Sequence, residues 1–351
     1  MPPSIIITTI FPPNDVMREI ASGCAKRGWD FIIAGDSKSP SDFRLDGATF
    51  LDIGSQRAMG EYGRLCPERT YARKNLAYLE AARRGAPFII ETDDDNMPGE
   101  GFWREPQREV AGRAVDSPGW VNAYKFFADR FIYPRGFPID LALPDWQDAL
   151  SISASQPSSF SISESQRLSI STSPIQQGLA DDNPDVDAVW RMLHPLPLKF
   201  RQDDPVVLGA GCWCPFNSQN TVFLPEAYPL LYLPATCSFR MTDIWRSFIA
   251  QRILWSCGWR LSFHAATVCQ ERNEHDLLRD FEDEISGYLG NKRIVSLLDS
   301  LDLAPGPDTI PANLGRCYAA LTREGFFRPE EEALLAAWLD DLPSTPIAHN
   351  Q

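Results

Sequence analysis

Short apolar segments alternate with amphipathic segments along the N-terminal part of the chain. The run Ser4–Ile10 is apolar and β-branched, which predicts a buried strand. Farther on, Val16, Ile20 and Cys24 recur at the spacing of one helix face, and Gly28 ends the pattern. The same reasoning predicts strands over residues 30–36, 48–53 and 86–92 and a helix over residues 70–84. This alternation predicts an α/β fold with a mostly parallel central sheet flanked by helices, which binds ligands at the carboxyl ends of its strands.

The later part of the chain is predicted to complete this fold and then to become helical. Residues 1–272 are expected to form one domain. Within it, the serine-rich stretch 151–175 is predicted to be either a protruding hairpin or an irregular loop. Residues 273–351 keep an apolar helical periodicity, which predicts a helical C-terminal region. The sequence leaves open whether this region is a lid, a packing element or an oligomer contact.

Charge and hydropathy exclude several classes of partner. The chain has 47 acidic and 33 basic residues and a net charge of −14, which argues against binding to nucleic acid or to anionic lipid. An anionic substrate must therefore be attracted by a local cluster of arginine, lysine or metal. No stretch approaches the roughly 18 apolar residues of a membrane span, and the first residues lack a basic segment followed by a long apolar one. We therefore expect no membrane span and a cytoplasmic location.

Three adjacent aspartates follow the predicted strand at residues 86–92. Because side chains alternate along an extended segment, Asp93 and Asp95 should leave on one side and Asp94 on the other. Carboxylates this close repel one another unless a cation or hydrogen bonds compensate. Mg²⁺ or Mn²⁺ bound by one or two of them, with water and phosphate oxygens as further ligands, is a common way to hold a diphosphate. The alternative is an acidic turn or the start of a helix.

Two arginines are candidates for binding the phosphates of such a ligand. Arg73 lies in the helix that precedes the aspartates, where it would meet a diphosphate or order the aspartate loop. A solvated charge near a helix start is the alternative. Arg135 lies in a turn between Pro134 and Pro138, which would fix its guanidinium for bidentate contact with a phosphate. A structural salt bridge is the alternative there.

Two further residues carry candidate chemistry. Asp243 stands near the start of a predicted helix, where it would cap the helix or act as a general base toward an attacking hydroxyl. His264 is expected to end a strand, where it would complete a metal site or form a hydrogen bond in the rim. Between them and the aspartates, the stretch 209–220 is rich in small and amide residues. It would suit sugar hydroxyls or be a packed loop.

The order of these motifs is similar to that of GT-A glycosyltransferases, in which an Arg-Asn helix precedes a DxD strand and an acidic residue heads a later helix. More closely, the chain resembles the plant STELLO family of glycosyltransferases and its microbial relatives, over about residues 5–343. The stretches that carry the resemblance are Thr8–Phe11, Thr92–Asp95, Pro134–Pro138, Ile175–Gly178, Pro184–Asp187, Asn217–Thr221, Gln251–Trp255, Arg323–Phe327 and Ala336–Leu339. The aspartate strand is more distantly similar to that of the reversibly glycosylated UDP-arabinopyranose mutase proteins.

The resemblance implies a Rossmann-like GT-A fold, a nucleotide-diphosphate sugar donor, most often a UDP-sugar, and Mn²⁺ or Mg²⁺ as cofactor. In this interpretation Thr9, Phe11 and Asp36 border the nucleoside, and Arg73 and Arg135 meet the diphosphate. Asp93 and Asp95, with His264, hold ribose and metal, and Asp243 is the base of an inverting transfer to a glycan or small-molecule acceptor.

Two other functions stay open at the level of sequence. The first is a nucleotide-sugar mutase, which rearranges the sugar and needs no acceptor. The second is a catalytically silent scaffold or assembly factor that keeps the fold. Plant members carry an N-terminal membrane anchor, whereas this chain begins at its first strand, so their Golgi location and cellulose-synthase partner are not expected here.

Overall fold

The computed structural model describes residues 1–142, 168–271 and 276–343. In these parts, an 11-stranded mixed sheet runs in the order β3-β2-β1-β4-β12-β9-β13-β10-β6-β8, with β5 paired to β13. The strands are β1 Ser4–Thr8, β2 Asp30–Ala34, β3 Thr49–Leu51, β4 Ile89–Thr92, β5 Asn96–Pro98, β6 Glu109–Val115, β7 Gly119–Trp120, β8 Leu168–Thr172, β9 Ile175–Asp181, β10 Val206–Leu208, β11 Cys212–Trp213, β12 Asn220–Phe223 and β13 Leu261–Gln270. The helices are α1 Asp15–Arg27, α2 Ile53–Ala58, α3 Glu61–Leu65, α4 Lys74–Arg83, α6 Ala188–Leu193, α7 Thr242–Ser256, α8 Leu277–Ser300, α9 Ile310–Arg323 and α10 Glu330–Asp341.

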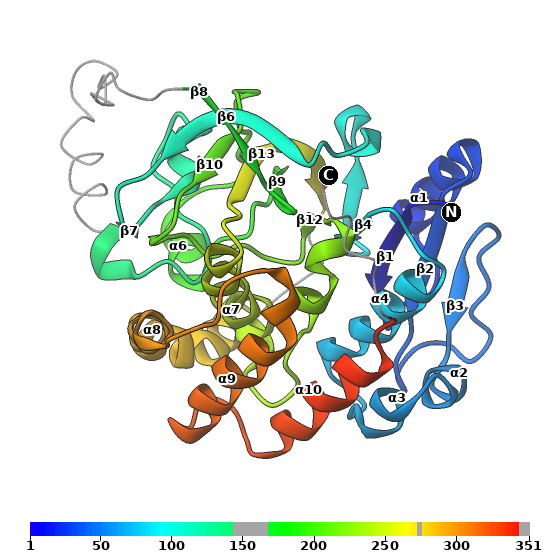
Figure 1. Cartoon of the computed structure of the whole chain (residues 1–351). Helices are drawn as coiled ribbons and strands as arrows, with labels where there is room; N and C mark the ends of the chain where they lie inside the picture. The colour runs from blue at the N-terminus through cyan, green and yellow to red at the C-terminus, as the bar shows by residue number, and fades with distance from the viewer. Residues whose placement is uncertain (143–167, 272–275, 344–351) are drawn as a thin grey trace.

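The predicted α/β class is confirmed, but the sheet is mixed where a mostly parallel one was predicted, since β9–β13 and β6–β10 are parallel pairs among antiparallel neighbours. Strands β3, β2, β1 and β4 are parallel neighbours, and Ile5 of β1 lies between Phe31 of β2 and Ile90 of β4. β12 then pairs antiparallel with both β4 and β9, so the sheet beyond β4 is mixed. Figure 1 shows these two parts of the sheet on opposite sides of β12.

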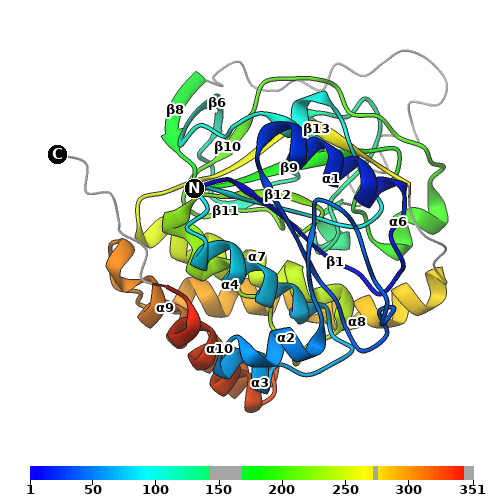
Figure 2. The same cartoon turned by 90° about the vertical axis from the view of Figure 1, so that its right-hand side faces the viewer.

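Helices cover both faces of the sheet, because the side chains of β1 alternate between two cores. Ile5 and Ile7 pack in the core that contains α1, whereas Ile6 packs in the core that contains α4 and α7. Figure 2 shows α1 on one side of the sheet and α4, α7, α9 and α10 on the other. Helix α1 begins at the cap Asn14, whose side chain accepts from the backbone N of Met17.

The helical C-terminal region predicted for residues 273–351 consists of α8, α9 and α10 in the described part of the chain. It shares the larger core with the N-terminal part, since Trp338 of α10 packs edge-on against Tyr62, with ring centroids 6.1 Å apart. The buried carboxylate of Glu331 accepts hydrogen bonds from the Tyr232 hydroxyl at 2.5 Å and from the backbone N of Thr236 at 2.8 Å. The C-terminal helices therefore pack on the face of the sheet that α4 and α7 cover.

A buried ion pair fixes the helix that carries Asp243 against the strand that carries the aspartates. The Arg246 guanidinium on α7 donates to both carboxylate oxygens of Glu91 on β4, at 2.9 and 2.6 Å. Both side chains are almost completely buried, and the Tyr78 hydroxyl donates to the same carboxylate. The relative position of β4 and α7 is thus set by a charged contact in the core.

Residues 151–167 of the serine-rich stretch lie outside the described residues, and residues 168–172 form β8, which pairs antiparallel with β6. Of the helices in the described ranges, none combines the length and the apolar character that crossing a bilayer requires.

Candidate functional site

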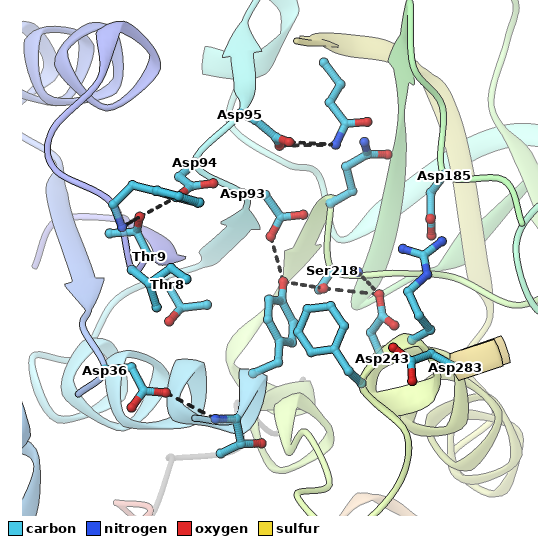
Figure 3. A pocket seen from close by; sticks show the side chains of 18 of the residues that line it. Thr8, Thr9, Asp36, Asp93, Asp94, Asp95, Asp185, Ser218, Asp243 and Asp283 are labelled. Carbon is cyan, nitrogen blue, oxygen red and sulfur yellow. Dashed lines mark hydrogen bonds between the residues drawn. The ribbon is translucent and has the colours of Figure 1, made fainter. Parts of the chain in front are cut away.

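A cavity of about 530 Å³ opens at the carboxyl ends of β1, β2 and β4. The structure brings Thr9, Asp36 and the three aspartates together there, as the alternation of strands and helices predicts. In Figure 3 Thr9 and the Asp93–Asp95 run lie on one side of the cavity, while Asp185, Asp243 and Asp283 lie on the other. The sheet thus supplies one wall, and the starts of α7 and α8 supply the other.

Each aspartate of the triplet has a different partner, and Asp94 and Asp95 lie in a turn after β4 and not in the extended segment that the predicted alternation assumed. The Thr9 hydroxyl donates to the carboxylate of Asp94, and the side-chain amide of Asn14, the cap of α1, donates to the Asp94 carbonyl at 2.7 Å. The Gln270 amide donates to both oxygens of Asp95, at 3.1 and 3.2 Å. Burial raises the pKa of Asp94 to about 6; the Thr9 hydrogen bond opposes this shift, and the Asp95 and Asp93 charges add to it.

Asp93 is held by a buried lysine that the sequence-based analysis missed. Lys74 is fully buried at the start of α4, and its Nζ lies 3.1 Å from Asp93 Oδ1, 2.6 Å from the Thr92 carbonyl and 2.8 Å from the Tyr71 hydroxyl. The Tyr71 hydroxyl in turn donates to Asp93 Oδ1 at 2.6 Å. The position of Lys74 in an Arg-Lys-Asn run at the start of the helix before the aspartate strand was the available signal, but the periodicity alone did not show which residue of the run faces inward.

Hydrogen bonds connect the two walls of the cavity through Ser218. Its hydroxyl lies 2.7 Å from the Tyr71 hydroxyl, and its backbone N and Oγ both lie 3.2 Å from Asp243 Oδ2. Ser218 and Gln219 line the cavity. Both residues belong to the stretch 209–220, for which the sequence predicted either contact with sugar hydroxyls or a packed loop. The preceding residue, Asn217, is buried, and its side chain accepts a hydrogen bond from the backbone N of Gln219. Asn217 therefore belongs to a packed loop.

Arg135 forms the structural salt bridge that was the alternative to phosphate contact. Its guanidinium donates to both oxygens of Asp185, at 2.8 and 2.9 Å, and to both oxygens of Asp243, at 3.0 and 2.9 Å. Burial alone would raise the pKa of Asp243, but the Arg135 guanidinium outweighs it and holds this pKa below its usual value. A carboxylate that is so strongly ion-paired is a weak proton acceptor. This geometry therefore disfavours the predicted roles of Arg135 as a phosphate ligand and Asp243 as the base.

The structure does not bring Arg73 and His264 to the cavity. Arg73 is buried, and its guanidinium donates to the carbonyls of Pro67 and Cys66 and to the side chain of Gln56. It therefore orders the loop before α4 and is not available to a diphosphate. His264 was expected to end its strand, but β13 continues to Gln270, so His264 lies in mid-strand, 2.9 Å from the Ser262 hydroxyl. Gln270, at the end of β13, lies beside Asp95, where His264 was predicted to lie.

Asp36 and Phe11 both lie at the edge of the cavity, near the carboxyl ends of β2 and β1. The Asp36 carboxylate accepts from the backbone N of Arg69 at 2.9 Å and of Thr70 at 3.2 Å, so it orders the loop that precedes α4. Phe11 follows β1, lines the cavity and leaves 45% of its surface exposed. Thr9 holds this turn, because its hydroxyl accepts from the backbone N of Phe11.

Three cations at the cavity were not identified from the sequence. Lys38, Arg69 and Arg279 line the cavity, and all three are exposed. Lys38 follows the strand-ending Asp36 by two residues, which was the one signal available. Arg69 owes its place to a left-handed backbone, with φ of 59°, which sequence periodicity does not reveal. In contrast, Arg240 lines the cavity but donates to Glu284, at 2.9 and 2.7 Å.

The carboxylates fit a metal site only in part. Among the described residues, no group of three or more histidine, cysteine or acidic side chains is arranged to hold a metal ion. Asp93 and Asp95 nevertheless both line the cavity, and hard divalent ions are often bound by one or two protein carboxylates when a phosphate supplies the other oxygens. Burial and the neighbouring Asp95 and Asp93 charges raise the pKa of Asp94, and a cation close by would act in the opposite direction.

A three-layer α/β fold with an acidic cavity at the carboxyl ends of its parallel strands is typical of enzymes that bind nucleotides. Sequence comparison finds similarity to one family of glycosyltransferases. Residues 240–350 match the family model of the STELLO glycosyltransferases. Two proteins of Arabidopsis thaliana, described as probable glycosyltransferases STELLO2 and STELLO1, are both 27% identical to the chain. The alignments cover 90% and 96% of this chain but 42% and 44% of those proteins. The chain is thus similar to these STELLO proteins and spans less than half of their length.

Proposed function

We propose that the protein is a glycosyltransferase that uses a nucleotide-diphosphate sugar, with a UDP-sugar as the first choice of donor. The observation that carries the proposal is the cavity itself. It combines three strand-end aspartates, an exposed aromatic ring and three exposed cations at the carboxyl ends of parallel strands. The similarity to proteins described as glycosyltransferases supports the same conclusion.

The donor's nucleoside fits the side of the cavity formed by β1 and β2. The exposed ring of Phe11 offers an apolar face to the base. Asp36 orders the loop that brings Arg69 to the cavity, and Lys38 lies two residues beyond Asp36. Arg69 and Lys38 are the cations that would meet the diphosphate from this side.

Asp93 and Asp95 are the residues that would hold Mn²⁺ or Mg²⁺ together with the donor. When bound, the ion supplies positive charge that stabilises the departing diphosphate. The chain prepares this site with Lys74 and Tyr71, which fix Oδ1 of Asp93, and with Gln270, which fixes Asp95. Fixed carboxylates lose little freedom when the ligand binds, which favours affinity.

Calorimetric titration with UDP, GDP and their sugar conjugates, with and without Mn²⁺, tests the proposal. We expect one nucleotide to bind more tightly when Mn²⁺ is present, and Asp95→Ala to abolish this dependence. Asp42→Ala is the matched control, because Asp42 is exposed and does not line the cavity. Folded wild-type protein that binds none of these nucleotides, or Asp95→Ala protein with unchanged metal dependence, would contradict the proposal.

A further inference from the structure

One carboxylate in the cavity stands apart from the others because no group in the described part of the chain donates to it. Seven aspartates line the cavity: Asp36, Asp93, Asp94, Asp95, Asp185, Asp243 and Asp283. The first six accept hydrogen bonds or ion pairs from the protein. Within the described ranges, no donor group lies at hydrogen-bond distance from the carboxylate of Asp283. Both of its oxygens are therefore available to a ligand hydroxyl.

Asp283 is held in place through its backbone and its neighbour. The Ser238 hydroxyl donates to the Asp283 carbonyl, and the Arg240 guanidinium donates to Glu284 in the next position of α8. These contacts join α8 to the short 3-10 helix Phe239–Met241. Asp283 itself is half-buried, so its side chain is presented to the cavity from a fixed backbone.

The same short helix places an aromatic ring in the cavity wall. Phe239 lines the cavity and leaves 56% of its surface exposed, which is unusual for a ring in a well-packed protein. It contacts Tyr71 edge-on, with ring centroids 5.7 Å apart. Because Tyr71 donates to Asp93, the exposed ring of Phe239 adjoins the aspartate side of the cavity.

An exposed ring beside an unpaired carboxylate suits a saccharide. The ring offers an apolar surface to the C–H face of a pyranose, and the carboxylate accepts from its hydroxyls. We propose that Phe239 and Asp283 form the acceptor subsite, that the acceptor is a saccharide, and that Asp283 takes the proton from the attacking hydroxyl. This inference rests on the proposed glycosyltransferase function.

The proposed transfer forms one bond at the anomeric carbon and breaks another. The acceptor oxygen forms a bond to the anomeric carbon of the donor. The bond from that carbon to the diphosphate oxygen breaks, and its electron pair stays on the diphosphate. The acceptor proton passes to Asp283. Asp243 is less suited to this task, because both of its oxygens accept from Arg135 and one also accepts from Ser218. Asp243 instead holds Arg135 and Ser218 in place beside the cavity.

Binding of simple glycosides tests the subsite without knowledge of the natural acceptor. Saturation-transfer NMR would be measured with methyl glycosides of glucose, galactose, xylose and arabinose, in the presence of UDP and Mn²⁺. We expect at least one glycoside to bind, and Phe239→Ala to weaken its binding at least tenfold while UDP binding changes less than twofold. Phe11→Ala should do the reverse. Phe281→Ala is the matched control, since Phe281 is exposed but lies outside the cavity lining.

Asp283→Asn tests the proton transfer. With the glycoside that binds, we expect UDP release from a UDP-sugar to fall about 100-fold in kcat, as for loss of a general base, while the KM for the donor stays within twofold. Glu282→Gln removes the same charge one residue away, outside the cavity lining, and should leave kcat unchanged.

The outcomes separate the inference from the proposed function. Protein that binds UDP but no glycoside overturns the acceptor subsite and leaves the donor site intact. Protein that binds UDP and a glycoside but releases no UDP from any UDP-sugar overturns the catalytic role of Asp283, as does Asp283→Asn with a kcat within threefold of wild type. Folded protein that does not bind UDP fails the proposed function itself.

Discussion

The buried pair of Glu91 and Arg246 gives the sharpest stability prediction. Arg246→Met removes two charge-assisted hydrogen bonds, at 2.9 and 2.6 Å, and leaves the Glu91 carboxylate in the core with Tyr78 as its partner. Removing one member of a buried pair costs about 3–5 kcal/mol, because the other charge stays desolvated. Burial alone would lower the pKa of Arg246, but Glu91 outweighs it and holds this pKa above its usual value. We therefore expect the free energy of unfolding to fall by about 3–5 kcal/mol.

A double-mutant cycle separates the loss of the pair from the loss of packing. Glu91→Met should cost a similar amount, since it leaves the Arg246 charge unpaired. The combined Glu91→Met/Arg246→Met variant keeps similar side-chain lengths with no charge, and we expect it to be at least about 2 kcal/mol more stable than either single variant. Adding Tyr78→Phe, which removes a hydroxyl that the double variant leaves unpaired, should stabilise it further.

Urea denaturation followed by tryptophan fluorescence measures these differences. Arg57→Met is the control, because its pair with Glu68 is exposed, with 58% and 35% of the side-chain surfaces accessible, and such pairs contribute about 0–1 kcal/mol. If Arg246→Met does not fold, Arg246→Lys keeps the charge and should cost about 1–3 kcal/mol through loss of one hydrogen bond to a charged group. Single variants within 1 kcal/mol of wild type, or a double variant whose cost equals the sum of the singles, would refute the reasoning.

Three further predictions concern the site and its surroundings. Lys74→Met removes the cation that fixes Asp93, so UDP should bind at least about tenfold more weakly in calorimetry, and unchanged affinity would show that Lys74 only packs. His264→Asn should leave Mn²⁺-dependent UDP binding within twofold, whereas a loss of metal dependence would restore His264 to the site. Burial raises the pKa of Asp187 to about 7, although the backbone N of Trp190 donates to it. The folded state therefore keeps this proton while the unfolded state loses it, so stability should fall by up to about 4 kcal/mol between pH 4 and pH 7. Asp187→Asn should flatten that fall in urea denaturation, and an unchanged slope would contradict the shift.

Much of the fold followed from the sequence, because local patterns determine local elements. The β-branched run at β1, the helix face of α1 and the apolar residues before Asp93 predicted the parallel part of the sheet. Chain order then placed the ends of β1, β2 and β4 at one rim. Aspartates that follow a buried strand could be located in this way, since a strand end fixes their position without long-range information.

The tertiary structure alone decided what each charged side chain does. Arg135 binds Asp185 and Asp243, Arg73 binds backbone carbonyls, and Lys74 is the cation that reaches Asp93. Sequence spacing cannot distinguish these outcomes, because the partners lie 6 to more than 100 residues away along the chain. Which charges are neutralised inside the protein and which, such as that of Asp283, stay available to a ligand depends on the packing of helices against the sheet. Long-range packing sets burial and partners, and these determine the chemistry of a carboxylate.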